Sequence, residues 1–301
     1  MSDLKEICVL SGKGGAGKSS ITASMAILIK ERMNIVLGDC DVDAPNLGLI
    51  TGLENVRFNC SPVEASERAS FVAERCKGRR KCVNVCRFRA IEWNGKLSVP
   101  EINALLCEGC GACEYICPDN AIEVRRVESG QICSFRSKYG FHVVTGRLKP
   151  GERGSGRIVD EVRKLTSAVG ESNESELAIF DSAAGIGCPV LSSVKGVDHA
   201  VIITEPTGVS MGDLRRALNL VNHFRVPKSI IINKWDINPD IAMEIEEMAA
   251  DEGIHVLGRI PYDLGFVDAL VNLTPAVLHK PELRKHFSGI TDNLLSDTGV
   301  I

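Results

Sequence analysis

The chain has 301 residues, of which 44% are hydrophobic and 25% are charged, a composition typical of a globular protein rather than a disordered one. Its formal net charge of -4 gives no general attraction to nucleic acid or to an anionic membrane. No apolar run approaches the length of a membrane span, and the N-terminus leaves no room for a signal peptide. We therefore expect a cytoplasmic protein that has neither a membrane nor nucleic acid as its partner.

Short apolar segments alternate with helical ones along most of the chain. Residues 4–10 predict a buried strand, and the segment after the next glycine-rich loop has apolar residues at helical spacing. A second strand then runs into an acidic loop. Further predicted strands lie within residues 176–185, 199–207, 228–236 and 254–263, and further helices at 210–224 and 239–252. This alternation predicts an α/β fold with a mostly parallel sheet and helices on both faces.

The alternation stops between residues 57 and 128, where cysteines gather. We interpret this segment as an inserted small domain, a ferredoxin-like α+β domain on the basis of its cysteine spacing. The α/β domain is then discontinuous and consists of residues 1–56 and 129–301.

A glycine-rich loop, GKGGAGKSS, lies between the first predicted strand and the first predicted helix, which is the context of a P-loop. Its glycines let backbone N–H groups turn towards phosphate oxygens, and the N-terminus of the helix adds a positive end. We expect Lys18 to reach the β- and γ-phosphates of ATP and Ser19 to bind Mg²⁺. The predicted nucleotide-binding set is Gly12, Lys13, Gly14, Gly15, Ala16, Gly17, Lys18, Ser19 and Ser20.

Three aspartates, Asp39, Asp41 and Asp181, fall at the ends of predicted strands. Open α/β sheets build their ligand sites at the carboxyl ends of strands. Phosphoryl transfer needs a lysine, a metal ion and a group that orients the attacking water. The P-loop and these carboxylates together predict a P-loop NTPase that hydrolyses ATP with Mg²⁺.

Seven of the 12 cysteines lie in two motifs. Cys107, Cys110, Cys113 and Cys117 with Pro118 have the C-x2-C-x2-C-x3-C-P spacing of a bacterial ferredoxin, in which the fourth cysteine binds the other cluster. Zinc is the alternative ligand of paired cysteines. A reducing compartment disfavours disulfides, so such spacing indicates metal or cluster ligation. The third cysteine and the proline favour an iron–sulfur cluster over zinc.

The first motif has the same spacing except that Arg79 stands where the second cysteine would be. Crossed ligation assigns one complete [4Fe–4S] site to Cys86, Cys107, Cys110 and Cys113. It leaves an incomplete second site on Cys76, Cys82 and Cys117. That site could hold a [3Fe–4S] cluster or a [4Fe–4S] cluster with an open iron, take a fourth ligand from Cys60 or Cys133, or be empty. For Cys8 and Cys188 we expect small buried side chains.

The two cysteine motifs also differ in the sign of their charge. Residues 76–89 carry basic side chains and no acidic one, whereas residues 107–123 carry acidic side chains and no basic one. We expect the basic end to bind an acidic redox or metallocofactor protein. RNA is a weaker candidate because Phe88 and Trp93 alone offer nearby stacking.

The loop sequence KGGAGK, with Lys13 inside it, resembles the deviant Walker A motif of the MinD, Mrp and nitrogenase iron protein superfamily. DCDVDAPN at 39–46, DSAAG at 181–185, NKWD at 233–236 and IPYD at 260–263 are similar to later elements of that superfamily. With its two cysteine motifs, the chain resembles the members that contain an inserted ferredoxin domain. It departs from them in having Arg79 for a cysteine and an arginine in place of the proline after the first motif.

The resemblance implies roles for individual residues. Lys13 would reach the partner's nucleotide across a nucleotide-dependent homodimer, and Asp41 would position the attacking water. The implied Mg²⁺ ligands are Ser19, Asp39 and Asp181. The implied adenine-side residues are Asn233 and Pro261.

These features predict an ATPase that couples ATP binding and hydrolysis to electron transfer, or to delivery of an iron–sulfur cluster or metallocofactor. The alternative is a MinD-like positioning or regulatory ATPase with a structural cluster. The C-terminal segment mixes charges, unlike a basic amphipathic membrane helix. ATP-dependent amide synthesis is a third alternative, but no glutaminase segment is apparent.

Overall fold

The computed structural model describes residues 4–52, 59–152 and 154–300. Its internal contacts divide the chain into two compact units. The larger unit comprises Met1–Ser61, Ile132–Arg147 and Ser155–Ile301, and the smaller comprises Pro62–Gln131 and Leu148–Gly154. The boundary predicted at residues 56–57 lies outside the described residues. The smaller unit also includes a short second segment that the sequence analysis placed in the α/β domain.

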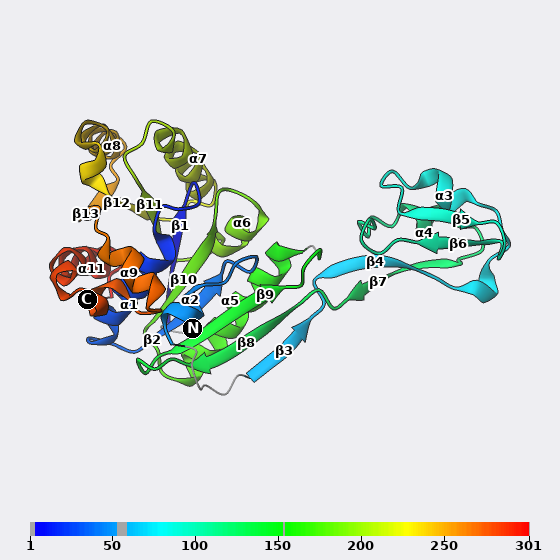
Figure 1. Ribbon diagram of the computed structural model, residues 1–301, viewed down its shortest axis with the longest axis horizontal. Helices are drawn as coiled ribbons and strands as arrows, with labels where there is room; N and C mark the ends of the chain where they lie inside the picture. The colour runs from blue at the N-terminus through cyan, green and yellow to red at the C-terminus, as the bar shows by residue number, and fades with distance from the viewer. Residues whose placement is uncertain (1–3, 53–58, 153, 301) are drawn as a thin grey trace. The chain divides into compact units, whose positions relative to one another are not determined.

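A nine-stranded sheet forms the framework of the larger unit, in the order β13-β12-β11-β1-β10-β2-β9-β8-β3 (Figure 1). The strands are β1 (Lys5–Ser11), β2 (Ile35–Cys40), β3 (Asn59–Val63), β8 (Gly130–Arg136), β9 (His142–Leu148), β10 (Leu177–Ala184), β11 (His199–Thr204), β12 (Lys228–Asn233) and β13 (His255–Ile260). The seven from β13 to β9 pair in parallel. The predicted α/β fold with a mostly parallel sheet is therefore confirmed.

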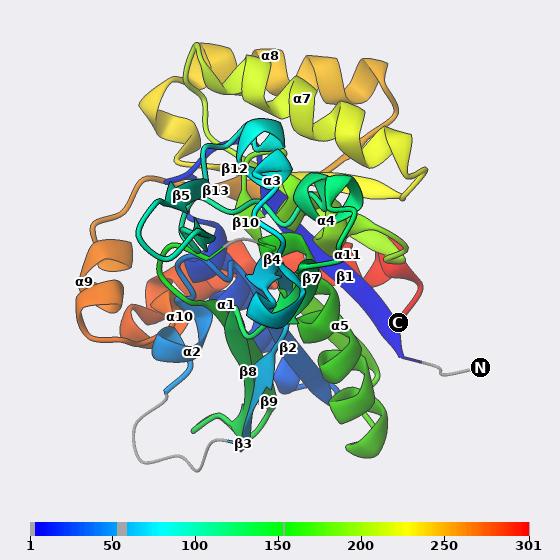
Figure 2. The ribbon, with the colours of Figure 1, turned by 90° about the vertical axis from the view of Figure 1, so that its right-hand side faces the viewer.

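Helices follow most of the parallel strands. They are α1 (Lys18–Lys30), α2 (Leu47–Ile50), α5 (Ser155–Ser172), α6 (Cys188–Val194), α7 (Ser210–His223), α8 (Pro239–Asp251), α9 (Gly265–Val271), α10 (Ala276–His279) and α11 (Arg284–Thr298). Figure 2 shows α7 and α8 side by side, as Figure 1 does from the perpendicular direction. The helices expected at 210–224 and 239–252 correspond to these two.

The core of the larger unit lies on both faces of the sheet. Ile7 and Val9 of β1 join a hydrophobic cluster with α1 and α11, while Cys8 and Leu10 point to the opposite face and are equally buried. On that opposite face, a Cβ added to Gly38 would lie 2.8 Å from the hydroxyl oxygen of Thr166, on α5. Strands buried on both faces consist of nearly continuous apolar residues, so their positions can be predicted from the sequence.

The smaller unit has two antiparallel strand pairs. β4 (Ser66–Phe71) pairs with β7 (Ile122–Val127), and β5 (Ile91–Asn94) pairs with β6 (Val99–Ile102). Two five-residue helices, α3 (Lys81–Val85) and α4 (Ala112–Ile116), complete it with a 3₁₀ turn at Ala73–Arg75. Its buried hydrophobic core, called here the small-unit core, consists of Cys82, Ile91, Cys113 and Ile122.

Candidate functional site

The P-loop connects β1 to α1, and its shape depends on glycine. Gly15 and Gly17 have φ angles of 85° and 86°, which side-chain-bearing residues rarely adopt. A Cβ on Gly12 would lie 2.4 Å from the carbonyl oxygen of Asp213, so this position also requires glycine. Because α1 begins at Lys18, the N–H groups of its first turn have no intrahelical partners. The loop therefore offers donors and a positive helix end to a phosphate group.

Lys18 is buried beneath this loop in an ion pair. Its Nζ lies 2.9 Å from Oδ1 of Asp181, and the two side chains are 7% and 0% exposed. The hydroxyl of Thr22 donates to the same carboxylate oxygen. Burial works to lower the pKa of Lys18, but the neighbouring aspartates, Asp181 above all, outweigh it and raise the pKa. Lys18 is therefore held as a cation where the phosphates of a nucleotide would bind.

Two buried carboxylates lie side by side next to Lys18. Asp39 of β2 is in register with Asp181 of β10, because the two strands are parallel neighbours. Asp39 accepts hydrogen bonds from the N–H groups of Leu47, at 3.0 Å, and Asp41, at 3.2 Å. Burial, and then the charge of Asp181, raise the pKa of Asp39 well above its usual range. Within the described residues, Oδ2 of Asp181 is buried without a hydrogen-bond partner, so it is free to accept from Mg²⁺-bound water.

A cavity of about 470 Å³ opens over the P-loop. Residues 14–20 of the loop and helix line it, together with Asp41, three residues near α2, Leu270 at the end of α9 and Leu273 just after that helix. Its volume suits a nucleotide, since small-molecule sites measure roughly 300–1,000 Å³. Burial raises the pKa of Asp41. The two leucines were missed by the sequence analysis, because no motif distinguishes them from ordinary helix residues.

Lys13 makes contacts elsewhere in the single chain. Its Nζ lies 2.6 Å from Oε1 of Glu205 and donates to the hydroxyl of Thr207 at 3.3 Å. Lys234 reaches the same glutamate at 3.0 Å and the carbonyl oxygen of Gly15 at 3.2 Å. Burial works to raise the pKa of Glu205, but hydrogen bonds from the two lysines outweigh it and lower the pKa. Glu205 was also missed, although its position directly after β11 is a strand end of the kind that gave the three aspartates.

The two residues assigned to adenine lie apart from the P-loop cavity lining. Asn233 is 3% exposed, and its amide donates to the carbonyl oxygen of Ala16 at 2.9 Å. A Cβ on Gly17 would lie 2.5 Å from the same amide nitrogen. Asn233 thus supports the loop from beneath, and Pro261 follows β13. An adenine contact by either residue stays a prediction.

Two cavities in the smaller unit are lined by cysteines of both motifs. The four-cysteine cavity, of about 20 Å³, is lined by Cys86, Cys107, Cys110 and Cys113. The three-cysteine cavity, of about 20 Å³, is lined by Cys76, Cys82 and Cys117. Crossed ligation assigns the cysteines to two separate clusters. The structure gathers the members of each group around a cavity of their own. In the part of the chain that the structure describes, no group of three or more His, Cys, Asp or Glu side chains lies close enough together to hold a single metal ion.

Backbone N–H groups point at several of these sulfur atoms. Ala90 donates to Sγ of Cys86 at 3.3 Å, and Ala69 donates to Sγ of Cys107 at 3.4 Å. In the three-cysteine cavity, Ala121 donates to Sγ of Cys117 at 3.3 Å. Such donors stabilise thiolates and tune the potential of an iron–sulfur cluster. The donor set therefore fits cluster ligation chemically.

A family model described as the CobQ/CobB/MinD/ParA nucleotide-binding domain matches residues 7–275. The chain belongs to this family. An uncharacterized protein of Methanocaldococcus jannaschii is 40% identical over 236 residues, which cover 78% of this chain and 80% of the relative. A protein of the same organism named iron-sulfur cluster carrier protein is 23% identical over 312 residues, covering 98% and 86% of the two chains.

Solved structures of the CobQ/CobB/MinD/ParA family have the same fold. The septum site-determining protein MinD of Pyrococcus horikoshii, complexed with Mg-ADP, has a TM-score of 0.58 at 16% identity, and the match covers 97% of this chain and 96% of that one. The P-loop ATPase fold expected from the sequence is therefore confirmed. Among the described residues, none of the helices is long and apolar enough to cross a membrane.

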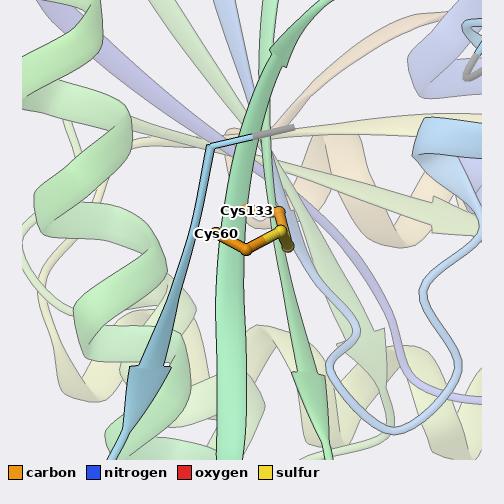
Figure 3. Close-up of a disulfide and its surroundings, with 2 residues drawn as sticks. All are labelled: Cys60 and Cys133. Carbon is orange, nitrogen blue, oxygen red and sulfur yellow. A yellow bond between two sulfur atoms is a disulfide. The ribbon is translucent and has the colours of Figure 1, made fainter. Parts of the chain in front are cut away.

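One of the alternatives for the incomplete cluster site and one expectation about the remaining cysteines are wrong. Cys60 and Cys133 form a disulfide, and both belong to the larger unit, so neither is available as a fourth cluster ligand in this structure (Figure 3). Cys188 is exposed at the start of α6 instead of buried, because it directly follows an open glycine turn. Cys8 is buried as expected, and burial raises the pKa of its thiol to about 12.

Proposed function

We propose that this protein is a Mg²⁺-dependent ATPase that couples its nucleotide state to iron–sulfur chemistry, by electron transfer or by delivery of a cluster or metallocofactor. One observation carries the proposal: a single chain contains both a P-loop cavity with a buried Lys18–Asp181 pair and a cavity lined by four cysteines from two motifs. Family membership supports the nucleotide half. The iron–sulfur half agrees with the name of a distant relative, the iron-sulfur cluster carrier protein.

In the nucleotide half, Lys18 binds the β- and γ-phosphates from its buried position. The residues that would hold Mg²⁺, directly or through water, are Ser19, Asp39 and Asp181. When bound, the ion neutralises charge that develops on the phosphates. Asp41, which lines the cavity, orients the attacking water. The buried free oxygen of Asp181 supports this arrangement, because a buried carboxylate oxygen needs a partner.

In the iron–sulfur half, the smaller unit is a ferredoxin-like domain inserted in the ATPase. The ligands of its [4Fe–4S] cluster are Cys86, Cys107, Cys110 and Cys113. The cluster supplies one-electron chemistry when bound. The N–H groups of Ala69 and Ala90 hold two of the sulfurs in place and favour their thiolate form.

Nucleotide binding brings two copies of the chain together in this proposal. Lys13 then leaves Glu205 and Thr207 and reaches the nucleotide of the partner subunit. In the single chain an ion pair of 2.6 Å holds the lysine on Glu205, and the proposed exchange would break it.

An acidic partner protein would dock on the basic end of the smaller unit. Lys77 and Arg79 pair with Asp119 there, and Arg80 stacks on Trp93, so these cations already have partners within the chain. The docking surface is therefore best sought at three other exposed basic residues, Lys81, Arg87 and Arg89.

A MinD-like positioning ATPase with a structural cluster is the second candidate. The observation that favours it is the fold similarity to MinD. The two candidates differ in one respect that can be measured: a structural cluster has the same redox and transfer properties whether or not ATP is bound.

The proposal is tested by purifying the full chain without oxygen and measuring iron, sulfide and ATP hydrolysis. We expect at least about four irons and four sulfides per chain, together with ATPase activity that requires Mg²⁺. Cys110→Ser should lose the iron of the four-cysteine cavity, and Cys188→Ser is the matched control, because both cysteines are exposed. Protein that binds ATP but takes up no iron or sulfide would contradict the iron–sulfur half.

A further inference from the structure

The two cysteine loops have the same backbone form although one of them lacks a cysteine. We call residues 76–82 the first cysteine loop and residues 107–113 the second cysteine loop. Gly78 and Gly109 occupy matching positions, with φ angles of 68° and 64°. Arg80 and Gly111 also match: they precede α3 and α4 with φ angles of 57° and 77°.

Arg80 holds this left-handed conformation at a cost, because its Cβ comes close to the following carbonyl oxygen there. Strained backbone that persists is often found at functional sites. The stacking of its guanidinium on Trp93, at 4.6 Å from the ring centroid, helps to keep the conformation. The first cysteine loop therefore keeps the form of a cluster-binding loop at an energetic cost.

The cavities that the two loops enclose also correspond. Each has a volume of about 20 Å³. Cys117 receives an N–H bond from the residue four positions later, at 3.3 Å, as Cys86 does in the other cavity. The three-cysteine cavity therefore differs from its counterpart mainly in one missing thiol.

Arg79, which stands at the sequence position of the missing cysteine, forms an ion pair. Nε of Arg79 donates to Oδ2 of Asp119 at 2.9 Å, and Nζ of Lys77 lies 3.7 Å from Oδ1. Arginine has donors alone and cannot bind iron. Asp119 is a different case: its side chain is 9% exposed, and it is the one carboxylate among the described residues that line the cavity. Asp119 thus brings a carboxylate oxygen to the lining of this cavity, within hydrogen-bonding distance of Arg79.

We infer that the three-cysteine cavity holds a second iron–sulfur cluster, on Cys76, Cys82 and Cys117, and that Asp119 is the oxygen ligand of its fourth iron, which is exchangeable. This inference rests on the proposed function and assigns the second site within it. Thiolates are the ligands that iron–sulfur clusters select, whereas carboxylate oxygen binds iron less tightly in such a site. The corner beside Asp119 is therefore the one that releases its metal.

Release of this iron is a ligand exchange without electron transfer. The bond from Asp119 oxygen to iron breaks, together with the three bonds from that iron to sulfide, and Fe²⁺ leaves. A [4Fe–4S]²⁺ core becomes [3Fe–4S]⁰, so charge and electrons balance. The freed carboxylate returns to Arg79 and Lys77, the contacts that the structure shows.

The test uses the full chain, reconstituted without oxygen and then treated with a ferrous chelator. We expect the wild-type protein to fall from about eight irons to about seven per chain, with a three-iron EPR signal after oxidation by ferricyanide. Added ⁵⁷Fe²⁺ should restore the eighth iron in the Mössbauer spectrum. Asp119→Asn should remain at about seven irons and take up none, while Glu92→Gln, a substitution at an exposed acid of the same unit, should behave as wild type.

A second variant keeps the inference testable if Asp119→Asn folds poorly. Arg79→Cys supplies the missing thiolate and should hold about eight irons that resist the chelator. Wild-type protein with about four irons, or an Asp119→Asn variant that exchanges iron like wild type, would overturn the inference and leave the proposed function standing. Protein without any iron–sulfur cluster would overturn both.

Discussion

The P-loop and the two cysteine loops are built alike but are supported differently. All three use glycines with positive φ and lead into a helix. Around the P-loop, contacts within the protein hold the site in place: Lys18 pairs with one carboxylate oxygen of Asp181, and Asn233 donates to the carbonyl of Ala16. Around the cysteine loops, the small-unit core has four buried residues, and two of them, Cys82 and Cys113, are cysteines themselves.

This difference indicates that the folding stability of the two units depends on bound ligands to different degrees. The larger unit has an extensive core on both faces of its sheet and folds around a preformed nucleotide site. The smaller unit is too small to gain much stability from its core alone. In such units the binding of metal supplies the folding free energy. We therefore expect loss of the clusters to unfold the smaller unit and to leave the larger unit intact.

The largest expected effect is that of removing a thiolate from the four-cysteine cavity. In Cys110→Ser, the backbone amides of the smaller unit should exchange at least about tenfold faster with deuterium, because local opening no longer has to break cluster bonds. Amides of β1, β10 and α1 should keep their protection. Cys188→Ser is the control. Unchanged protection of the smaller unit in iron-free protein would show that its core suffices without a cluster.

The next effect concerns the buried ion pair of the larger unit. Lys18→Ala leaves Asp181 buried and unpaired, which should lower the free energy of unfolding by about 3–5 kcal/mol and weaken ATP binding at least about a hundredfold. Urea unfolding and calorimetric titration measure the two quantities. Lys164→Ala, at a lysine whose side chain is 71% exposed, should change neither. Wild-type ATP affinity in Lys18→Ala would disprove the role of this lysine.

Lys13 should affect turnover rather than binding. Lys13→Ala should lower the rate of ATP hydrolysis at least about tenfold and leave the dissociation constant for ATP within about threefold. The reason is that Lys13 is paired with Glu205 in the single chain and acts only in the dimer. Lys5→Ala, at an exposed surface pair, is the control. An unchanged rate would remove Lys13 from the mechanism.

The smallest expected effect is that of replacing Asn233, and it shows whether this residue supports the P-loop or contacts adenine. Asn233→Ala loses the hydrogen bond to Ala16 and should lower the stability of the nucleotide-free protein by about 1–2 kcal/mol. Differential scanning of the apo protein measures this. If the stability of the apo protein did not change while adenine specificity did, Asn233 would be an adenine contact after all.

Features that depend on local sequence were accessible before the structure. The strands around Ile7 and Phe180 are continuous apolar runs, and the P-loop has its own residue pattern. The spacing of the cysteines suggested two groups, and the structure places those groups around two cavities.

Features that depend on contacts between distant residues were not accessible. Lys13 and Glu205 are 192 positions apart, and Cys60 and Cys133 are 73 apart. Neither pair belongs to a spaced motif, so only the packing of the strands brings the partners together. The orientation of Asn233 beneath the P-loop likewise follows from the pairing of β12 with β11. Sequence located the residue at a strand end but did not show which way its amide points.

The central claim is that nucleotide state and iron–sulfur chemistry are coupled, and the reduction potential of the cluster tests it most directly. We would measure that potential by EPR-monitored titration of the anaerobic protein, without nucleotide and with Mg-ATP, in wild type and in Lys18→Ala. The account predicts a shift with Mg-ATP in the wild type and none in the variant. Identical potentials in all four samples, from protein that demonstrably binds ATP in its wild-type form, would contradict it and favour a structural cluster.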